Sequence, residues 1–157
     1  MKKRLEALKK DQKGFTLVEL IVVLVILAIL AALLVPALLG YIDRAREAKY
    51  LEEARSIYTA IQAVNDENYA KGAEHVANVD AGKDAIDKLV SPTSVNSGTI
   101  TYLSADKGTT SDDIHKYYTV SAMTGLSFTS QDGSDITADM AADGTWTIKN
   151  IVKTTTP

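Results

Sequence analysis

Glu19 lies at the start of a long apolar segment, where a charged side chain has few partners. No charged residue follows it between Leu20 and Ile42, and residues 20–35 consist only of Leu, Ile, Val and Ala. An uncharged run of this length predicts a membrane-spanning helix, which needs about 20 apolar residues. An ionisable group inside such a helix costs roughly 2.5–3.5 kcal/mol or more unless it has a partner, so Glu19 is a candidate functional residue.

A partner for Glu19 arises if the chain is cut between Gly14 and Phe15. Glycine has no side chain, so a peptidase can approach the backbone closely at this point. Cleavage would leave Phe15 with an α-amino group, whose reference pKa of about 7.7–8.0 keeps it largely charged. This amine, on the same chain or on a neighbour, can pair with Glu19, and the helix dipole also favours a carboxylate here. The alternative is a hydrated, unpaired Glu19 at the level of the lipid headgroups.

Residues 13–19, Lys-Gly-Phe-Thr-Leu-Val-Glu, resemble the N-terminal signature of type IV prepilins and pseudopilins. Gly14 matches the last residue of a basic leader, Phe15 the first mature residue and Glu19 the fifth. Pro36 matches a proline later in the apolar anchor. The resemblance ends near residue 58, and beyond that point only the general style of a small head domain is similar.

The resemblance implies how the chain is processed, assembled and located. Prepilin peptidase would cleave after Gly14 and methylate the amine of Phe15, and contacts between Glu19 and Phe15 of different subunits would set their stagger in a helical filament. An assembly platform protein and an ATPase would be indirect partners. The chain would first be a single-pass protein of the cytoplasmic membrane with its N-terminus in the cytoplasm, and would then form an extracellular pilus on the cell surface.

The leader, residues 1–14, is basic and the rest of the chain is acidic. The leader holds six of the 17 Lys and Arg residues and two of the 20 Asp and Glu residues, which leaves 11 against 18 in the mature chain. Excess Lys and Arg marks the cytoplasmic side, so the C-terminal part faces outward. A secretory signal peptide is the rival interpretation, but the apolar run is longer than its 7–15 residues. The acidic mature chain argues against nucleic acid as a partner.

The sequence contains no motif of a catalytic or cofactor site. Cysteine is absent, which excludes disulfides and favours a Gram-positive-type pilin or a pseudopilin over the disulfide-closed Gram-negative pilins. His75 and His115 lack a metal-binding spacing, and no nucleophile–base motif occurs. We therefore expect no enzyme and no cofactor. One weak calcium candidate, which does not match the EF-hand pattern, consists of Asp132, Asp135, Asp139 and Asp143.

A long helical pattern followed by several strand-like runs predicts an α+β fold, in which a long N-terminal helix packs on a small antiparallel β-sheet head. The helix has a transmembrane half and an amphipathic half, and a connecting loop with a short helix at 83–90 leads into the sheet. The expected segments are a cleaved leader at 1–14, the transmembrane and assembly half of the helix at 15–42, the amphipathic half at 43–70, the connecting loop at 71–98 and the sheet head at 99–157.

Apolar residues recur at spacings of three and four in the amphipathic half, which predicts the face that packs on the head. Pro36 lacks a backbone donor and Gly40 is a poor helix former, so the segment between them is a candidate for local melting in a filament or for a simple kink at the membrane boundary. Lys71-Gly72 predicts the helix end. The residues of the packing face are Leu51, Ala54, Ile57, Tyr58, Ile61 and Val64.

Turn signals divide the C-terminal half into short strands. Asn96-Ser97-Gly98 predicts a turn before the first strand, and Asp143-Gly144 predicts a hairpin between the last two. The pattern indicates an antiparallel meander of three or four strands with the amphipathic helix on one face. The expected strands are 99–103, 114–120, 126–129, 136–140 and 145–151.

Three functions remain open on this basis. The first is a structural subunit of a type IV pilus, which serves motility, adhesion or biofilm formation. The second is a pseudopilin of a type II secretion or competence DNA-uptake system. The third is a minor pilin or adhesin that acts as a binding module. Glu19 favours the first two, because some initiating minor subunits of the family lack this glutamate.

Overall fold

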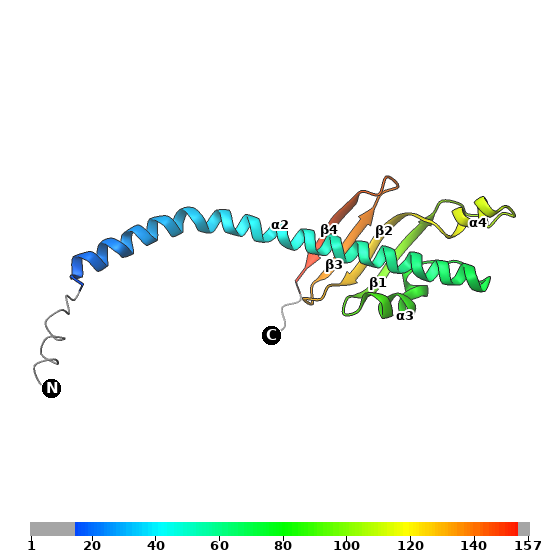
Figure 1. The fold of residues 1–157 in the computed structure, drawn as a ribbon, viewed down its shortest axis with the longest axis horizontal. Coiled ribbons are helices and arrows are strands. Elements are labelled where there is room, and N and C mark those ends of the chain that lie inside the picture. The colour runs from blue at the N-terminus through cyan, green and yellow to red at the C-terminus, as the bar shows by residue number, and fades with distance from the viewer. Residues whose placement is uncertain (1–14, 154–157) are drawn as a thin grey trace, which may run out of the picture. The chain divides into compact units, whose positions relative to one another are not determined.

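The structure, a computed structural model, describes residues 15–153 (Figure 1). The predicted fold class is confirmed, because a long N-terminal helix precedes a four-stranded antiparallel sheet. The chain divides after Arg44 into two compact units, and the first helix contributes to both. The elements are α2 (Leu17–Lys71), α3 (Val79–Val90), β1 (Ser94–Tyr102), α4 (Ser111–Tyr118), β2 (Val120–Thr129), β3 (Asp135–Met140) and β4 (Trp146–Val152).

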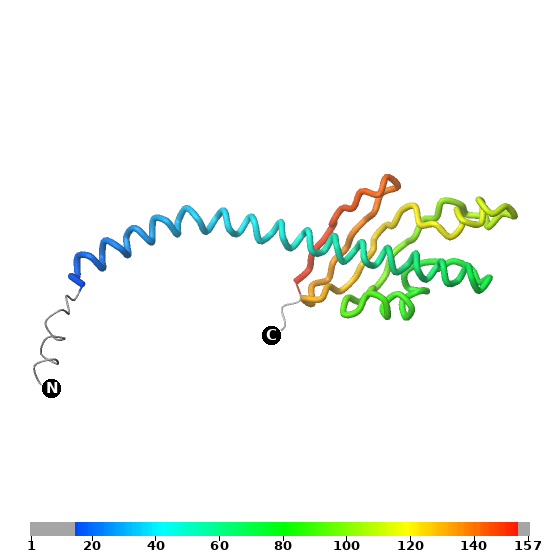
Figure 2. Tube along the Cα trace, viewed as in Figure 1, coloured from blue at the N-terminus to red at the C-terminus, as the bar shows by residue number. Residues whose placement is uncertain are grey.

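The sheet of the second unit is a meander in the order β1-β2-β3-β4, and the tube in Figure 2 follows its path. Met123 of β2 is paired with Ile100 of β1 on one side and with Met140 of β3 on the other. Met123, Leu126 and Phe128 are fully buried, while residues between them are partly or largely exposed. This alternation is typical of an antiparallel sheet with one face on the core.

The second half of α2 supplies the other layer of the core. Ala54, Ile57 and Ile61 are 0% exposed, whereas Leu51 and Tyr58 of the predicted packing face are half-buried. The helix also buries side chains that the predicted face did not include. One of them, Asn65, donates to the carbonyl of Tyr118 and accepts from the amide of Val76. The buried residues of α2 are Tyr50, Glu53, Ala54, Ile57, Ala60, Ile61, Val64 and Asn65.

Helix α2 ends where the sequence predicted. Gly72 has a positive φ of 68°, and its amide donates to the carbonyl of Tyr69 at 3.1 Å while the amide of Ala73 donates to Asn68 at 2.9 Å. These two bonds form a Schellman motif, which satisfies the last carbonyls of a helix and uses glycine in the left-handed conformation. The predicted hairpin at Asp143-Gly144 is also confirmed between β3 and β4.

The predicted turn at residues 96–98 is wrong, because β1 already begins at Ser94 and runs through this segment with register shifts. The short helix is longer than predicted and begins at Val79, where the side chain of Asn78 caps it by accepting from the amide of Ala81 at 2.8 Å. The predicted connecting loop therefore contains a complete helix and the start of the sheet.

The predicted strand at residues 114–120 is wrong for most of its length, because residues 111–118 form α4. Thr110 caps this helix by accepting from the amide of Asp113 at 3.2 Å, and Lys116 pairs with Asp112 one turn earlier at 2.6 Å. Such local bonds favour a helix over an isolated strand. The strand that was expected here begins only at Val120.

The docking of α2 on the head includes a polar contact at the turn between β2 and β3. Asp132 accepts from Tyr50 Oη at 3.1 Å and from the Ser134 amide at 3.0 Å, and it lies 3.2 Å from Lys49 Nζ. Partial burial raises the pKa of the Asp132 carboxyl, but the hydrogen bonds from Ser134, Lys49 and Tyr50 outweigh it and hold the pKa well below its usual range. The turn is therefore tied to α2 by an ionised carboxylate.

We expect Ile61→Ala to lower the free energy of unfolding of the head by about 2–5 kcal/mol, because it leaves a cavity between α2 and the sheet. The control is Leu103→Ala, whose side chain is 60% exposed and which should cost less than about 0.5 kcal/mol. Thermal unfolding of the two full-length variants in detergent measures this. Equal melting temperatures would contradict the assignment of the core.

We expect Asp132→Asn to lower the stability of the head at neutral pH by about 1 kcal/mol, since the carboxylate is 40% exposed and its contacts are screened by water. The lowered pKa means that this stabilisation is complete above the unfolded pKa of about 3.9 and is lost as the pH falls through the folded value. The difference in melting temperature between wild type and variant should therefore shrink below about pH 4. Asp84→Asn, at an exposed position of α3, is the control, and a difference that persists unchanged at low pH would contradict the role of Asp132.

Candidate functional site

The first unit of the structure presents an apolar helix that no other segment among residues 15–153 covers. Every large apolar side chain from Leu17 to Ile42 is at least 36% exposed, and most are exposed by half or more. Helix α2 is long and apolar enough to cross a membrane, judged by length and composition. Full burial of one such side chain is worth roughly 1.5–3 kcal/mol, so this surface strongly favours lipid or other apolar helices over water.

Helix α2 begins with a reciprocal pair of hydrogen bonds between Thr16 and Glu19. The backbone amide and the hydroxyl of Thr16 donate to Glu19 Oε2 at 2.8 Å and 2.7 Å, and the amide of Glu19 donates to Thr16 Oγ1 at 3.2 Å. This is a capping box, in which a threonine before the helix and a glutamate three residues later satisfy each other's amides. The contact fixes the carboxylate beside the first turn, next to Phe15.

Among residues 15–153, the Glu19 side chain has hydrogen bonds only with Thr16, and all of them use Oε2. Glu19 itself is exposed. The carboxylate is thus positioned by its own helix and keeps Oε1 for a further donor. At the positive end of the helix dipole, it is suited to bind a cation such as an α-amino group.

Thr16 is a candidate site residue that the sequence pattern could have revealed. Thr followed three residues later by Glu before an apolar run is the signature of a capping box. The predicted site residues of this segment were Gly14, Phe15 and Glu19 only. The structure adds it as the group that orients Glu19.

The other predicted residues of the N-terminal segment lie as follows. Gly14 falls outside the described residues. Phe15 precedes the helix and is 82% exposed. Pro36 and Gly40 both lie inside α2, which remains α-helical from residue 34 to residue 40. Melting of this segment in a filament stays a prediction.

The calcium candidate is not supported by the structure, because its four aspartates have separate partners. Asp132 binds Tyr50 and Lys49, as described above, and Asp135 accepts from the Thr129 hydroxyl at 2.8 Å. Asp139 accepts from the amide of Gly125 at 2.7 Å, and Asp143 accepts from the amide of Thr145 at 2.9 Å. Within residues 15–153, no group of three or more His, Cys, Asp or Glu side chains is arranged to hold a metal ion.

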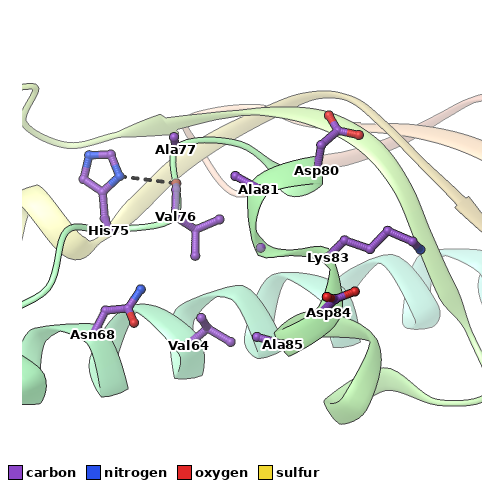
Figure 3. Close-up of a pocket in the computed structure, with 11 residues that line it drawn as sticks. Val64, Asn68, His75, Val76, Ala77, Asp80, Ala81, Lys83, Asp84 and Ala85 are labelled. Carbon is purple, nitrogen blue, oxygen red and sulfur yellow. Dashed lines mark hydrogen bonds between the residues drawn. The ribbon is translucent and has the colours of Figure 1, made fainter.

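A cavity of about 570 Å³ lies between α2 and α3, and Figure 3 shows the side chains around it. Two of its ionisable residues have contacts within the head. His75 Nδ1 is 3.3 Å from the carbonyl of Val76, and Lys83 binds Asp87 at 2.7 Å and the carbonyl of Val95. The Lys83 ammonium is thus held by a carboxylate and a backbone carbonyl in an ion pair of α3.

The two histidines, which lie far apart in the sequence, both contact one cluster of tyrosines. His75 stacks on Tyr102 with a centroid distance of 3.9 Å, and His115 lies 5.7 Å from the ring of Tyr69. The hydrogen bond from Tyr117 to Glu74 and partial burial raise the pKa of Tyr117 to about 12. This tyrosine is therefore neutral at pH 7, and the cluster packs the end of the head rather than forming a metal site.

Comparison with known proteins adds one finding. A family model described as the prokaryotic N-terminal methylation motif matches residues 9–35. No curated protein and no solved structure matched the chain. The matched segment includes the Gly14–Phe15 bond and Glu19, together with most of the uncovered apolar helix.

The matched motif and the observed elements agree with each other. The motif covers the end of the basic N-terminal segment, from residue 9, and the first part of α2, and the helix is followed by the antiparallel sheet head of a pilin-like fold. The apolar helix near the N-terminus is suited to anchoring the chain in a membrane. The chain therefore carries a class III signal like that of type IV pilins and pseudopilins, and its fold is pilin-like.

Proposed function

We propose that this chain is the structural subunit of a type IV pilus, processed by prepilin peptidase between Gly14 and Phe15 and polymerised through residues 15–42. The observation that supports this most is the apolar surface of α2, which is exposed along its whole length from Leu17 to Ile42. Such a surface is stable in two settings, the membrane before assembly and a bundle of identical helices after it.

Glu19 gives the helix bundle its register. In a bundle of identical apolar helices, sliding one helix along another costs little, because every face is made of similar side chains. One carboxylate per helix changes this, since an unpaired charge in an apolar interior is far more costly than a paired one. The amine created at Phe15 is the cation that a neighbouring subunit can supply. Thr16 holds the carboxylate ready for it through the capping box.

The head supports the role of a surface subunit. It is folded without cysteine, by a core between α2 and one face of the sheet. A head that folds without cysteine agrees with a structural subunit of the cysteine-free, Gram-positive type. The proposed partners are other copies of the chain, the peptidase and, indirectly, the platform protein and ATPase.

The direct test is to shear the surface of native cells, image the released material and determine the N-terminus of this chain by mass spectrometry. Long filaments made mainly of this chain, beginning at a methylated Phe15, are the expected result. A correctly processed chain that stays in the membrane fraction would replace the proposal with a pseudopilin or minor subunit. A chain that begins at any other residue would contradict the assigned cleavage site.

We expect Gly14→Trp to block removal of the leader, because a bulky side chain prevents the close approach of the peptidase to the backbone. The mass of the chain in membrane extracts should then include residues 1–14. Gly40→Ala is the matched control, since a Cβ at Gly40 meets no atom within 4 Å, and it should be processed normally. Normal processing of the Trp variant would contradict the role of Gly14.

We expect Glu19→Ala to be cleaved normally but to form few filaments when it is the only subunit present. Loss of one partner of a buried charge pair costs about 3 kcal/mol per subunit, which is more than a hundredfold in an association constant. Glu67→Ala removes an exposed carboxylate whose partner is Lys71 on the same helix, and its filament yield should equal that of the wild type. Equal yields for both variants would exclude Glu19 from assembly.

A further inference from the structure

A second cavity, of about 490 Å³, lies at one end of the sheet, where segments of all four strands meet α2. Its buried part includes Val120, at the start of β2, and Met140, at the end of β3, which are 4% and 6% exposed. Trp146 begins β4 and is paired with Met140, and Leu103 directly follows β1. Tyr58 of α2 completes this part of the lining. The cavity therefore has an apolar interior.

Two half-buried aromatic rings line this cavity, Tyr58 from the helix and Trp146 from the sheet. Neither ring stacks on another aromatic ring among residues 15–153, and neither Tyr58 Oη nor Trp146 Nε1 has a hydrogen bond there. Tyr and Trp usually have a hydrogen-bond partner for these atoms when they are buried. Neither atom is fully shielded from solvent. Both therefore remain available to a ligand that offers apolar surface and hydrogen-bonding groups together.

The lining also includes one donor group and one acceptor group that carry charge. Arg55 of α2 is 59% exposed, and its ion pair with Glu52 is long, at 3.8 Å, and also exposed. Asp143 of the hairpin between β3 and β4 is exposed too, and its Oδ1 accepts from the amide of Thr145 at 2.9 Å. A guanidinium group only donates hydrogen bonds and a carboxylate only accepts them. Hydroxyl groups do both, so they can bond to either side chain.

We propose that this cavity binds a neutral hexose unit of a carbohydrate, with a face of the sugar ring on Trp146 and the sugar hydroxyl groups bonded to the polar atoms around it. A hexose ring has C–H groups on its faces and hydroxyl groups on its edge, which is the combination that the lining calls for. The cavity volume falls within the range of about 300–1,000 Å³ that is typical of small-molecule sites. The inference goes beyond the proposed function, because it concerns the head alone.

Two other kinds of ligand fit this cavity less well. A purely apolar ligand would bury Tyr58 Oη and Trp146 Nε1 without giving them partners, which is costly. An anionic ligand would be repelled by the charge of the protein, since residues 15–157 hold 18 Asp and Glu residues against 11 Lys and Arg residues. On a filament with many copies of the head, even weak sites for a neutral sugar would act together.

The first test uses the fluorescence of Trp146, which is the single tryptophan of the sequence and so reports on this cavity. The full-length chain, in a detergent without a sugar headgroup such as lauryldimethylamine oxide, is titrated with glucose, galactose, mannose, N-acetylglucosamine and N-acetylgalactosamine. We expect a saturable change of emission with at least one of them, with a Kd of about 1 mM. A linear response to every sugar up to about 100 mM, a hundredfold excess over that Kd, would overturn the proposal.

Cyclohexanol separates recognition of a sugar from simple filling of an apolar cavity, since it has a ring of the same size but only one hydroxyl group. It should bind at least about tenfold more weakly than the best sugar, because it leaves polar atoms of the lining without partners. Binding as tight as that of the sugar would show a merely apolar site. Tighter binding of glucuronate would show an anion site at Arg55. Either result would overturn the proposal.

Variants of Tyr58 place the binding in this cavity. Tyr58→Phe keeps the ring that packs against the core and removes the hydroxyl group, so the Kd for the best sugar should rise about fivefold. Tyr58→Leu also removes the ring and should raise the Kd at least about tenfold. The control is Tyr69→Leu, at a tyrosine of the same helix that is 44% exposed and lies outside this cavity, and it should leave the Kd unchanged. Equal Kd values for wild type and Tyr58→Phe would overturn the proposal.

The outcomes separate this inference from the proposed function. The titration uses the monomer in detergent, so sugar binding by a chain that forms no surface filaments would support the inference and contradict the pilus. Filaments that begin at a methylated Phe15, made of a chain that binds none of the sugars, would leave the pilus subunit in place and overturn only the ligand of the cavity.

Discussion

The apolar surface of α2 between Leu17 and Ile42 is the constraint on which the rest of the protein depends. No other part of the described chain covers it, and water is a poor solvent for it, because each large side chain left exposed forgoes roughly 1.5–3 kcal/mol. The protein therefore needs a second apolar phase throughout its life. In the proposed function, a membrane serves this need before assembly and identical helices serve it afterwards. Anchoring and polymerisation would then both follow from this one surface.

The second half of α2 differs from the first, because its apolar residues are covered by the head. Its apolar residues are buried on the sheet, and polar contacts such as that between Tyr50 and Asp132 fix the turn beside it. The head thus folds on a helix whose other half stays free for lipid or neighbours. Two carboxylates of this helix and its head differ in a similar way. Asp132 has hydrogen-bond partners within the chain, whereas Oε1 of Glu19 has no hydrogen bond among the described residues.

The elements that are marked by the spacing of apolar residues or by glycine-containing stops and turns could be predicted from the sequence. They include the apolar run, the stop at Gly72 and the hairpin at Gly144. Helix α4 could not be predicted, because Tyr117, Tyr118 and Val120 are residues typical of a strand. The helix is favoured instead by its cap, in which Thr110 accepts from the amide of Asp113. The early start of β1 depends on tertiary contacts, since Asp87 of α3 accepts from the amide of Val95 at 2.8 Å. The capping role of Thr16, in contrast, was readable from the sequence and was overlooked.

The most direct test of this account is a high-resolution reconstruction of the sheared filament. The account predicts that residues 15–42 of many copies form a central bundle that excludes water. In that bundle the Glu19 carboxylate should lie about 3 Å from the Phe15 amine of a neighbouring subunit. A filament held together by head contacts alone, with Glu19 far from any amine, would contradict the central claim that this helix and its one carboxylate direct assembly.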